Sequence, residues 1–177
     1  MPWYGEAGDG MKGKDLALRG LLLALSLTLG WLESLLPLSF TVPGIKLGLP
    51  NLAVVFALYR LSWRDAALIS LLRVLLMSLL FGSWAALAWS AAGAALSLAV
   101  MALLKRTDKF RIAAVSVAGG VAHNLGQIAV AALVLETARI VYYLPVLLVS
   151  GTAAGVIIGL LSAVLVRRVG PGGKKGN

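Results

Sequence analysis

Long apolar runs, separated by short polar breaks, follow one another along this 177-residue chain. A helix needs about 20 apolar residues to cross the hydrocarbon core of a membrane. Five runs reach that length and one is shorter, while 60% of the residues are hydrophobic and only 13% are charged. This pattern excludes an ordinary soluble domain. It predicts an all-α integral membrane bundle of six transmembrane helices, near residues 16–37, 48–61, 65–82, 84–104, 111–136 and 144–167.

The positions of the charges predict how the bundle is oriented. Of the 16 lysines and arginines, 13 lie toward the N-terminus, toward the C-terminus, or in the breaks near residues 60–64 and 105–111. On a six-helix path these four places share one side of the membrane, which the positive-inside rule makes the cytoplasmic side. We therefore expect a multi-pass protein of the cell membrane with both termini in the cytoplasm. In this prediction residues 15–168 form the transmembrane domain, residues 1–14 are a disordered tail, and residues 169–177 are a flexible basic tail.

The net charge of +9 also bears on possible partners. A nucleic-acid patch or an anionic-lipid site would be another use for these cations. The cations are dispersed in small groups at the ends of the apolar runs, which favours the topological explanation. We expect contact with membrane lipid and no nucleic-acid partner.

The segment from Pro43 to Asn51 interrupts what would otherwise be a complete crossing. The apolar run after Pro50 is about ten residues long, or roughly 15 Å of helix, which makes the second helix short. We expect an irregular external segment that dips into the membrane before this helix, whose start offers a site for an anionic group with the charge of Lys46 beside it. The alternative is an ordinary external loop in which Lys46 extends to water.

Several strongly polar residues also fall inside the predicted helices. A charged side chain within a membrane costs at least roughly 3 kcal/mol, so each one needs a partner or a purpose. A Glu33–Arg73 ion pair and an amide network would fix the packing of the helices. Alternatively, the polar side chains would line a pocket for a small anionic or polar ligand, which is the interpretation we favour because they come from different helices. The residues concerned are Glu33, Arg73, His123, Asn124 and Gln127.

Small residues recur at every fourth position in several apolar runs, as in Gly20 and Ala24, and in Gly151, Gly155 and Gly159. Such spacing lets the backbones of two membrane helices approach closely. The contact would be internal packing or docking on a partner membrane protein, and the spacing alone is compatible with both.

No catalytic pattern is evident. The chain has no cysteine and a single histidine. It has no aspartate-rich pair for a magnesium–diphosphate site, no zinc-peptidase motif and no His/Asp relay beside a serine. We expect a protein that is not an enzyme and that needs no cofactor or metal.

Several motifs together resemble the Gx transporter family, which is also known as heptaprenyl diphosphate synthase component I. They are the stretches Glu33 to Pro37, Pro43 to Asn51, Arg73 to Gly82, His123 to Gln127 and Tyr143 to Pro145. That family is similar to the S components of energy-coupling-factor transporters, which are six-helix proteins that capture small molecules from outside the cell. The resemblance implies an S-component-like fold in which Lys46, Asn51, Arg73, His123, Asn124 and Gln127 face the ligand. It also implies that Gly20 and Ala24 dock on a transmembrane coupling subunit that works with ATPases.

Three functions therefore stand as hypotheses. The first is an uptake protein of the S-component kind with one cavity facing outside. The second is a non-catalytic membrane component of polyprenyl diphosphate or quinone metabolism, with a groove open to lipid beside Lys46. The third is a structural membrane subunit, in which Glu33, Arg73 and His123 pair with one another and leave no cavity.

Overall fold

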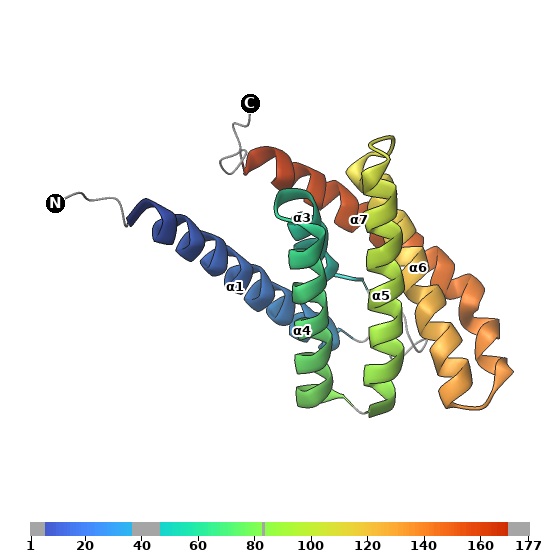
Figure 1. The fold of residues 1–177 in the computed structure, drawn as a ribbon. Helices are drawn as coiled ribbons and strands as arrows, with labels where there is room; N and C mark the ends of the chain where they lie inside the picture. Colours follow the sequence, from blue (N-terminus) through green and yellow to red (C-terminus); the bar gives the residue numbers. More distant parts are fainter. Residues whose placement is uncertain (1–5, 37–46, 83, 170–177) are drawn as a thin grey trace.

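The structure is a computed structural model that describes residues 6–36, 47–82 and 84–169, with side chains from Gly13 onward. Within these ranges every regular element is a helix, which confirms the all-α prediction (Figure 1). The first helix begins at Glu6, earlier than the predicted start near residue 16. The elements are α1 (Glu6–Ser34), α3 (Asn51–Arg60), α4 (Trp63–Phe81), α5 (Trp84–Arg106), α6 (Ile112–Val134), the 3-10 helix η1 (Ala138–Tyr143) and α7 (Leu144–Arg168).

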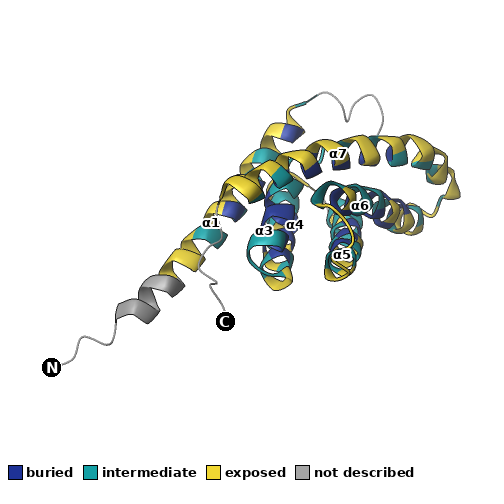
Figure 2. Cartoon of the chain, turned by 90° about the horizontal axis from the view of Figure 1, so that it is seen from above, coloured by how far each residue is buried: buried dark blue, intermediate teal, exposed yellow. Residues whose placement is uncertain are grey.

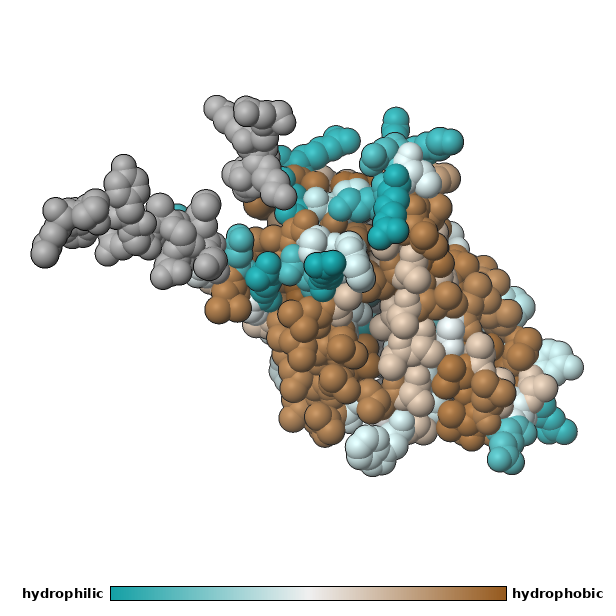
Figure 3. Space-filling model, in the orientation of Figure 1, coloured by the Kyte–Doolittle hydropathy of each residue, from teal (hydrophilic) through white to brown (hydrophobic). Residues whose placement is uncertain are grey.

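Four segments within the described residues are long and apolar enough to cross a membrane. Helix α4 has 19 residues but includes three charged side chains, and α3 has 10 residues. Large apolar side chains such as Leu79, Leu133 and Val149 are exposed, and the face of the bundle seen in Figure 3 is largely hydrophobic below its hydrophilic end. The structure is thus a helical bundle of the membrane type. The four segments are Gly13–Ser34, Trp84–Arg106, Ile112–Val134 and Ala138–Arg168.

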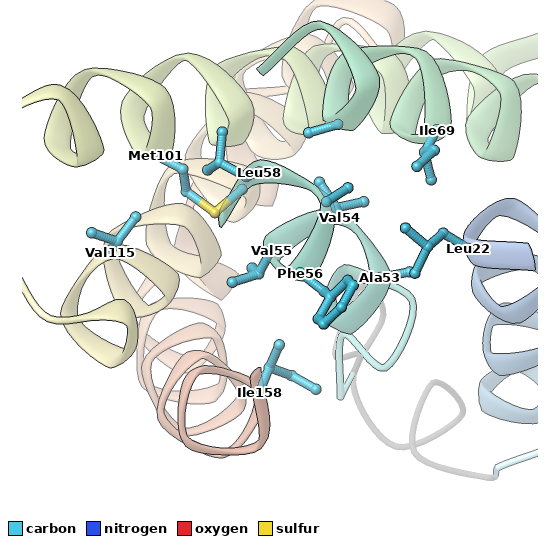
Figure 4. Packing of buried hydrophobic residues seen from close by; sticks show 12 residues of the cluster. Leu22, Ala53, Val54, Val55, Phe56, Leu58, Ile69, Met101, Val115 and Ile158 are labelled. Atoms are coloured by element: carbon cyan, nitrogen blue, oxygen red, sulfur yellow. The ribbon is translucent and has the colours of Figure 1, made fainter. Parts of the chain in front are cut away.

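The short helix α3 lies at the centre of the hydrophobic core (Figures 2 and 4). Every residue from Ala53 to Leu58 is at most 7% exposed. A helix that is apolar on all sides is stable only when other elements surround it. Here Leu22 of α1, Ile69 of α4, Met101 of α5 and Ile158 of α7 belong to the same core cluster. The second helix is therefore short, as predicted, and it is enclosed by the other helices.

A tight turn leads into α3. Gly48 has a φ of +71°, a left-handed conformation that favours glycine, and its carbonyl oxygen accepts the N–H of Asn51 at 2.9 Å. Pro50 precedes the first helical residue, and its carbonyl oxygen accepts the buried hydroxyl of Ser26 at 3.3 Å. This bond fixes the start of α3 against α1. Residues 37–46, which include the predicted dipping segment and Lys46, lie outside the described part of the chain.

Basic residues gather at one end of the bundle, as their positions in the sequence predict, and Figure 3 shows a group of hydrophilic side chains there. Ser62 caps α4 by accepting the N–H of Asp65 at 3.1 Å. The carboxylate of Asp65 forms an ion pair with Arg19 Nε at 2.8 Å, which joins α1 to α4.

Two further cations at this end join other helices. Lys105 of α5 donates its ammonium group to the carbonyl oxygen of Leu58 in the last turn of α3. Arg60 of α3 donates to the carbonyl oxygen of Val169, directly after α7. Carbonyl groups in the last turn of a helix lack partners within that helix, so cations are favourable there.

Helices α6 and α7 pack through their small residues. Added Cβ atoms on Gly151, Gly155 and Gly159 would lie 2.5 Å from atoms of α6, with backbone atoms of α6 no more than 3.0 Å away. No larger side chain fits at these positions. The run of small residues on α7 therefore serves internal packing, which is one of the two uses that its spacing allows.

Candidate functional site

A cavity of about 360 Å³ lies inside the bundle, beside the turn that precedes α3. This volume falls in the range of small-molecule pockets, about 300–1,000 Å³. Helices α1, α4, α5, α6 and α7 all contribute to its wall. Polar side chains are frequent in the lining, namely those of Glu33, Ser34, Asn51, Arg73, Ser78, Ser90, Ser116, His123, Asn124 and Gln127.

Six of the seven predicted ligand-facing residues line this cavity. The seventh, Lys46, lies outside the described residues, although the next residue in the chain, Leu47, is part of the lining. The structure thus brings together side chains that the sequence places on four different helices, and ligand binding by them stays a prediction. The six residues are Glu33, Asn51, Arg73, His123, Asn124 and Gln127.

The predicted docking residues lie elsewhere. Gly20 and Ala24 are exposed on the outward face of α1, and no atom lies within 4 Å of a Cβ placed on Gly20. This face is open to a neighbouring helix. Docking of a partner on it stays a prediction.

Glu33, at the end of α1, is only 8% exposed. Its two carboxylate oxygens accept the backbone N–H groups of Gly48 at 2.8 Å and Leu49 at 3.1 Å. The sequence predicts an anionic group of a ligand near the start of α3. In the structure the carboxylate of Glu33 accepts the N–H groups at this position. Glu33 and Arg73 do not form an ion pair within 4.0 Å. Among the described residues, the ion pair at that distance joins Arg19 to Asp65.

Arg73 lines the cavity from the middle of α4. Its Nε atom is buried and has no hydrogen-bond partner among the described residues. Buried polar atoms in proteins are nearly always hydrogen-bonded, and a buried guanidinium is especially costly to leave unpaired. Arg73 is therefore the group in the lining most in need of a partner.

The polar flank of α6 combines packing with exposure to the cavity. Asn124 is buried and donates its side-chain amide to the carbonyl oxygen of Leu147 in α7. His123 and Gln127 lie against Gly93 of α5, where an added Cβ would be 2.6 Å from Gln127 Cγ and 3.1 Å from His123 Cε1. The missing side chain at Gly93 leaves room for both polar residues.

Sequence reasoning missed Gly93 and several serines of the lining. Ser78, Ser90 and Ser116 each interrupt an apolar helix and face the cavity. An isolated serine in an apolar helix is a weak signal, because serine also serves helix packing in membranes. These serines indicate a cavity only when it is known that they face the same space as Arg73 and His123, and that requires the packing of the helices.

The lining is rich in groups that can form hydrogen bonds. Hydroxyl and amide groups predominate, together with one guanidinium, one imidazole and one carboxylate that is already hydrogen-bonded to the backbone. Among the described residues no group of three or more His, Cys, Asp or Glu side chains is placed to hold a metal ion. The arrangement can hold a small polar molecule by hydrogen bonds and one charge interaction.

Comparison with known proteins places the chain in a family. A family model described as heptaprenyl diphosphate synthase component I matches residues 22–165. No curated protein and no solved structure matches the chain. The match confirms the synthase-component family that the motifs indicated, whereas the similarity to S components stays a prediction. Because the match covers most of its length, the chain belongs to the heptaprenyl diphosphate synthase component I family.

Proposed function

We propose that this protein is a membrane-embedded binding protein that captures a small anionic or polar molecule in the cavity, in the manner of an S component of an energy-coupling-factor transporter. One observation carries the proposal: polar side chains from α1, α3, α4 and α6 meet in a cavity of about 360 Å³ within an otherwise apolar bundle. Polar groups inside membrane helices are costly and mark functional sites by default.

The position of the cavity supports entry from the external side. The lining residues of α1 lie in its last turns, and those of α4 lie in its second half, away from the basic end. In our proposal α3 and α4 complete a six-helix path with both termini in the cytoplasm. A ligand then reaches the cavity from outside the cell, opposite the basic end.

A partner subunit is the second part of the proposal. The family name describes one component of an assembly. The exposed face of α1 around Gly20 and Ala24 offers close approach to a helix of a transmembrane coupling subunit, which would work with ATPases. Substituting both residues with leucine is expected to abolish that association without loss of folding, because both are exposed and no described atom outside the helix lies within 4 Å of a Cβ on Gly20.

The family name also supports a second candidate function, a non-catalytic membrane component of polyprenyl diphosphate metabolism. A chain of seven isoprenoid units is far larger than the cavity, so it would have to extend into lipid while its diphosphate lies inside. A purely structural subunit is the least favoured of the three hypotheses, because it requires no cavity.

Native mass spectrometry of the purified full chain, with extraction of the bound molecule, tests the proposal. Ala154 lines the cavity, and the adjacent Ala153 is exposed on the outer surface of α7. We expect the wild type and Ala153→Phe to carry a small molecule that Ala154→Phe has lost. Extraction of a polyprenyl diphosphate would support the second function instead. A bound species common to all three proteins would contradict binding in this cavity.

A further inference from the structure

The charges around the cavity are arranged unequally. The described lining contains one guanidinium, that of Arg73, and one carboxylate, that of Glu33. Each has the opportunity to neutralise the other, yet no ion pair joins them, and the Nε atom of Arg73 is buried without a hydrogen-bond partner among the described residues. The guanidinium thus faces the cavity without direct contact to the carboxylate, although Glu33 is near enough to act on it electrostatically.

Glu33 is held elsewhere by the backbone. Its oxygens accept the N–H groups of Gly48 and Leu49 at 2.8 and 3.1 Å. Paired backbone N–H groups at a helix start form a typical site for a phosphate or carboxylate. Glu33 already fills that site with an anion of the chain.

The next N–H groups of α3 are also occupied. Those of Asn51, Leu52 and Ala53 donate to the carbonyl oxygens three residues earlier, at 2.9, 3.1 and 3.2 Å. Pro50 has no N–H group, and every other backbone N–H group from Gly48 to Ala53 has an acceptor within the chain. The start of α3 therefore has no free N–H group for the anion of a ligand.

We infer that the cavity takes ligands with a single anionic group, which lies against Arg73, and that Glu33 determines this specificity by occupying the start of α3. A carboxylate or phosphate ester on Arg73 would give its Nε atom a charge-assisted hydrogen bond. A second negative group would lie near the charge of Glu33, which disfavours it in a water-poor site. The neutral remainder of the ligand meets the amides of Asn51 and Gln127.

This inference rests on the proposed function, and it bears on the alternative. The headgroup of a prenyl diphosphate carries several negative charges, so this cavity discriminates against it. A small organic monoanion is the class of ligand that the charges fit.

Three probes of equal chain length test the charge preference: pentanoate with one carboxylate, glutarate with two, and pentanamide with none. Each is added to the purified full-length protein in detergent, and the apparent Kd is obtained from the rise in unfolding temperature with probe concentration. For the wild type we expect pentanoate to bind about tenfold more tightly than either of the other probes. Glutarate binding as tightly as pentanoate, or pentanamide binding as tightly as pentanoate, would overturn the inference.

Variants separate specificity from folding. Arg73→Gln is expected to reduce the preference for pentanoate over pentanamide to less than about twofold, and Arg73→Lys to retain it in part. Glu33→Gln keeps the size of the side chain but removes its charge, so the affinity for glutarate is expected to rise about tenfold. Glu136→Gln makes the same change of charge at an exposed glutamate outside the cavity, so it serves as the control and is expected to leave all ratios unchanged. A Glu33→Gln protein that keeps the wild-type ratio of glutarate to pentanoate would refute the role of Glu33.

The proposed function and this inference fail in different ways. If Ala154→Phe abolishes binding of all probes while the wild type does not distinguish pentanoate from pentanamide, binding in the cavity is supported and the preference for an anion is refuted. If Ala154→Phe changes nothing, the cavity itself is not the binding site. Should Arg73→Gln fail to fold, the order of the three probes on the wild type still decides the charge preference.

Discussion

Gly155 of α7 lies so close to Val117 of α6 that a Cβ on the glycine would be 2.5 Å from the Cα atom of Val117. No real side chain tolerates that separation. One turn further along α7, a Cβ on Gly159 would come equally close to the Cα atom of Ala113. The two backbones are thus in direct contact, which is how membrane helices associate where lipid supplies no hydrophobic driving force between them.

The first prediction compares two glycines in different surroundings. Gly155→Ala forces α6 and α7 apart and is expected to destabilise the fold by about 1–3 kcal/mol. Gly20→Ala places its methyl group in open space and is expected to stabilise α1 by up to about 1 kcal/mol, because alanine favours helix over glycine. Thermal unfolding in detergent measures both effects. Equal changes in the two variants would contradict the packing described here.

The second prediction concerns the hydrogen bonds of Glu33. Glu33→Ala removes the acceptor of the Gly48 and Leu49 N–H groups, so hydrogen exchange at these two amides is expected to accelerate about tenfold or more. The measurement is hydrogen–deuterium exchange with mass spectrometry on peptides that cover the start of α3. Ser34→Ala is the control, because its hydroxyl bonds only to Trp31 among the described residues. Unchanged exchange in Glu33→Ala would show that the carboxylate does not hold this turn.

A third prediction distinguishes two neighbouring cations at the end of α5. Lys105 donates to the carbonyl oxygen of Leu58 and lies 5.2 Å from the ring centroid of Tyr59, whereas Arg106 is exposed. We expect Lys105→Met to cost about 1–3 kcal/mol of unfolding free energy and Arg106→Met to stay within about 0.5 kcal/mol. Chemical unfolding monitored by tryptophan fluorescence measures the difference. A larger effect at Arg106 would refute the role given to Lys105.

The fourth prediction is the orientation of the bundle in the membrane. A fluorescent protein fused after Arg168 is expected to fluoresce in the cytoplasm. Alkaline phosphatase inserted at Glu136, between α6 and η1, is expected to be active outside, because these two positions lie at opposite ends of α7. Loss of fluorescence in the C-terminal fusion, together with an inactive phosphatase at Glu136, would contradict the predicted topology.

Much of the fold is predictable from the sequence because the membrane restricts the choices. Apolar runs set the helices, and observed ends such as Phe81 and Trp84 lie within a few residues of the predicted ones. Pro50 predicts a break before the short helix, and α3 begins directly after it. Polar residues inside apolar runs predict a shared site, since each needs a partner that lipid does not supply.

The partners themselves are less predictable. The sequence suggests that Glu33 pairs with a cation, but its carboxylate bonds to the N–H groups of Gly48 and Leu49. That result depends on how a turn outside the helices is placed, and periodicity carries no information about turns. Likewise, Gly93 leaves space for His123 only because α5 and α6 meet at those positions. The spacing of small residues was the same for Gly151 and for Gly20, yet one faces α6 and the other faces outward.

The glycine contacts between α6 and α7 make one side of the cavity rigid, whereas another part of its wall is adaptable. The backbone of Gly120 meets that of Gly151 without an intervening side chain, so little can be rearranged on this side. The opposite wall contains Met77 of α4, whose flexible thioether side chain lies close to Gly30 of α1. If the cavity binds a ligand as we propose, rotation of the Met77 side chain would accommodate small differences in ligand shape, whereas the contact between α6 and α7 would not.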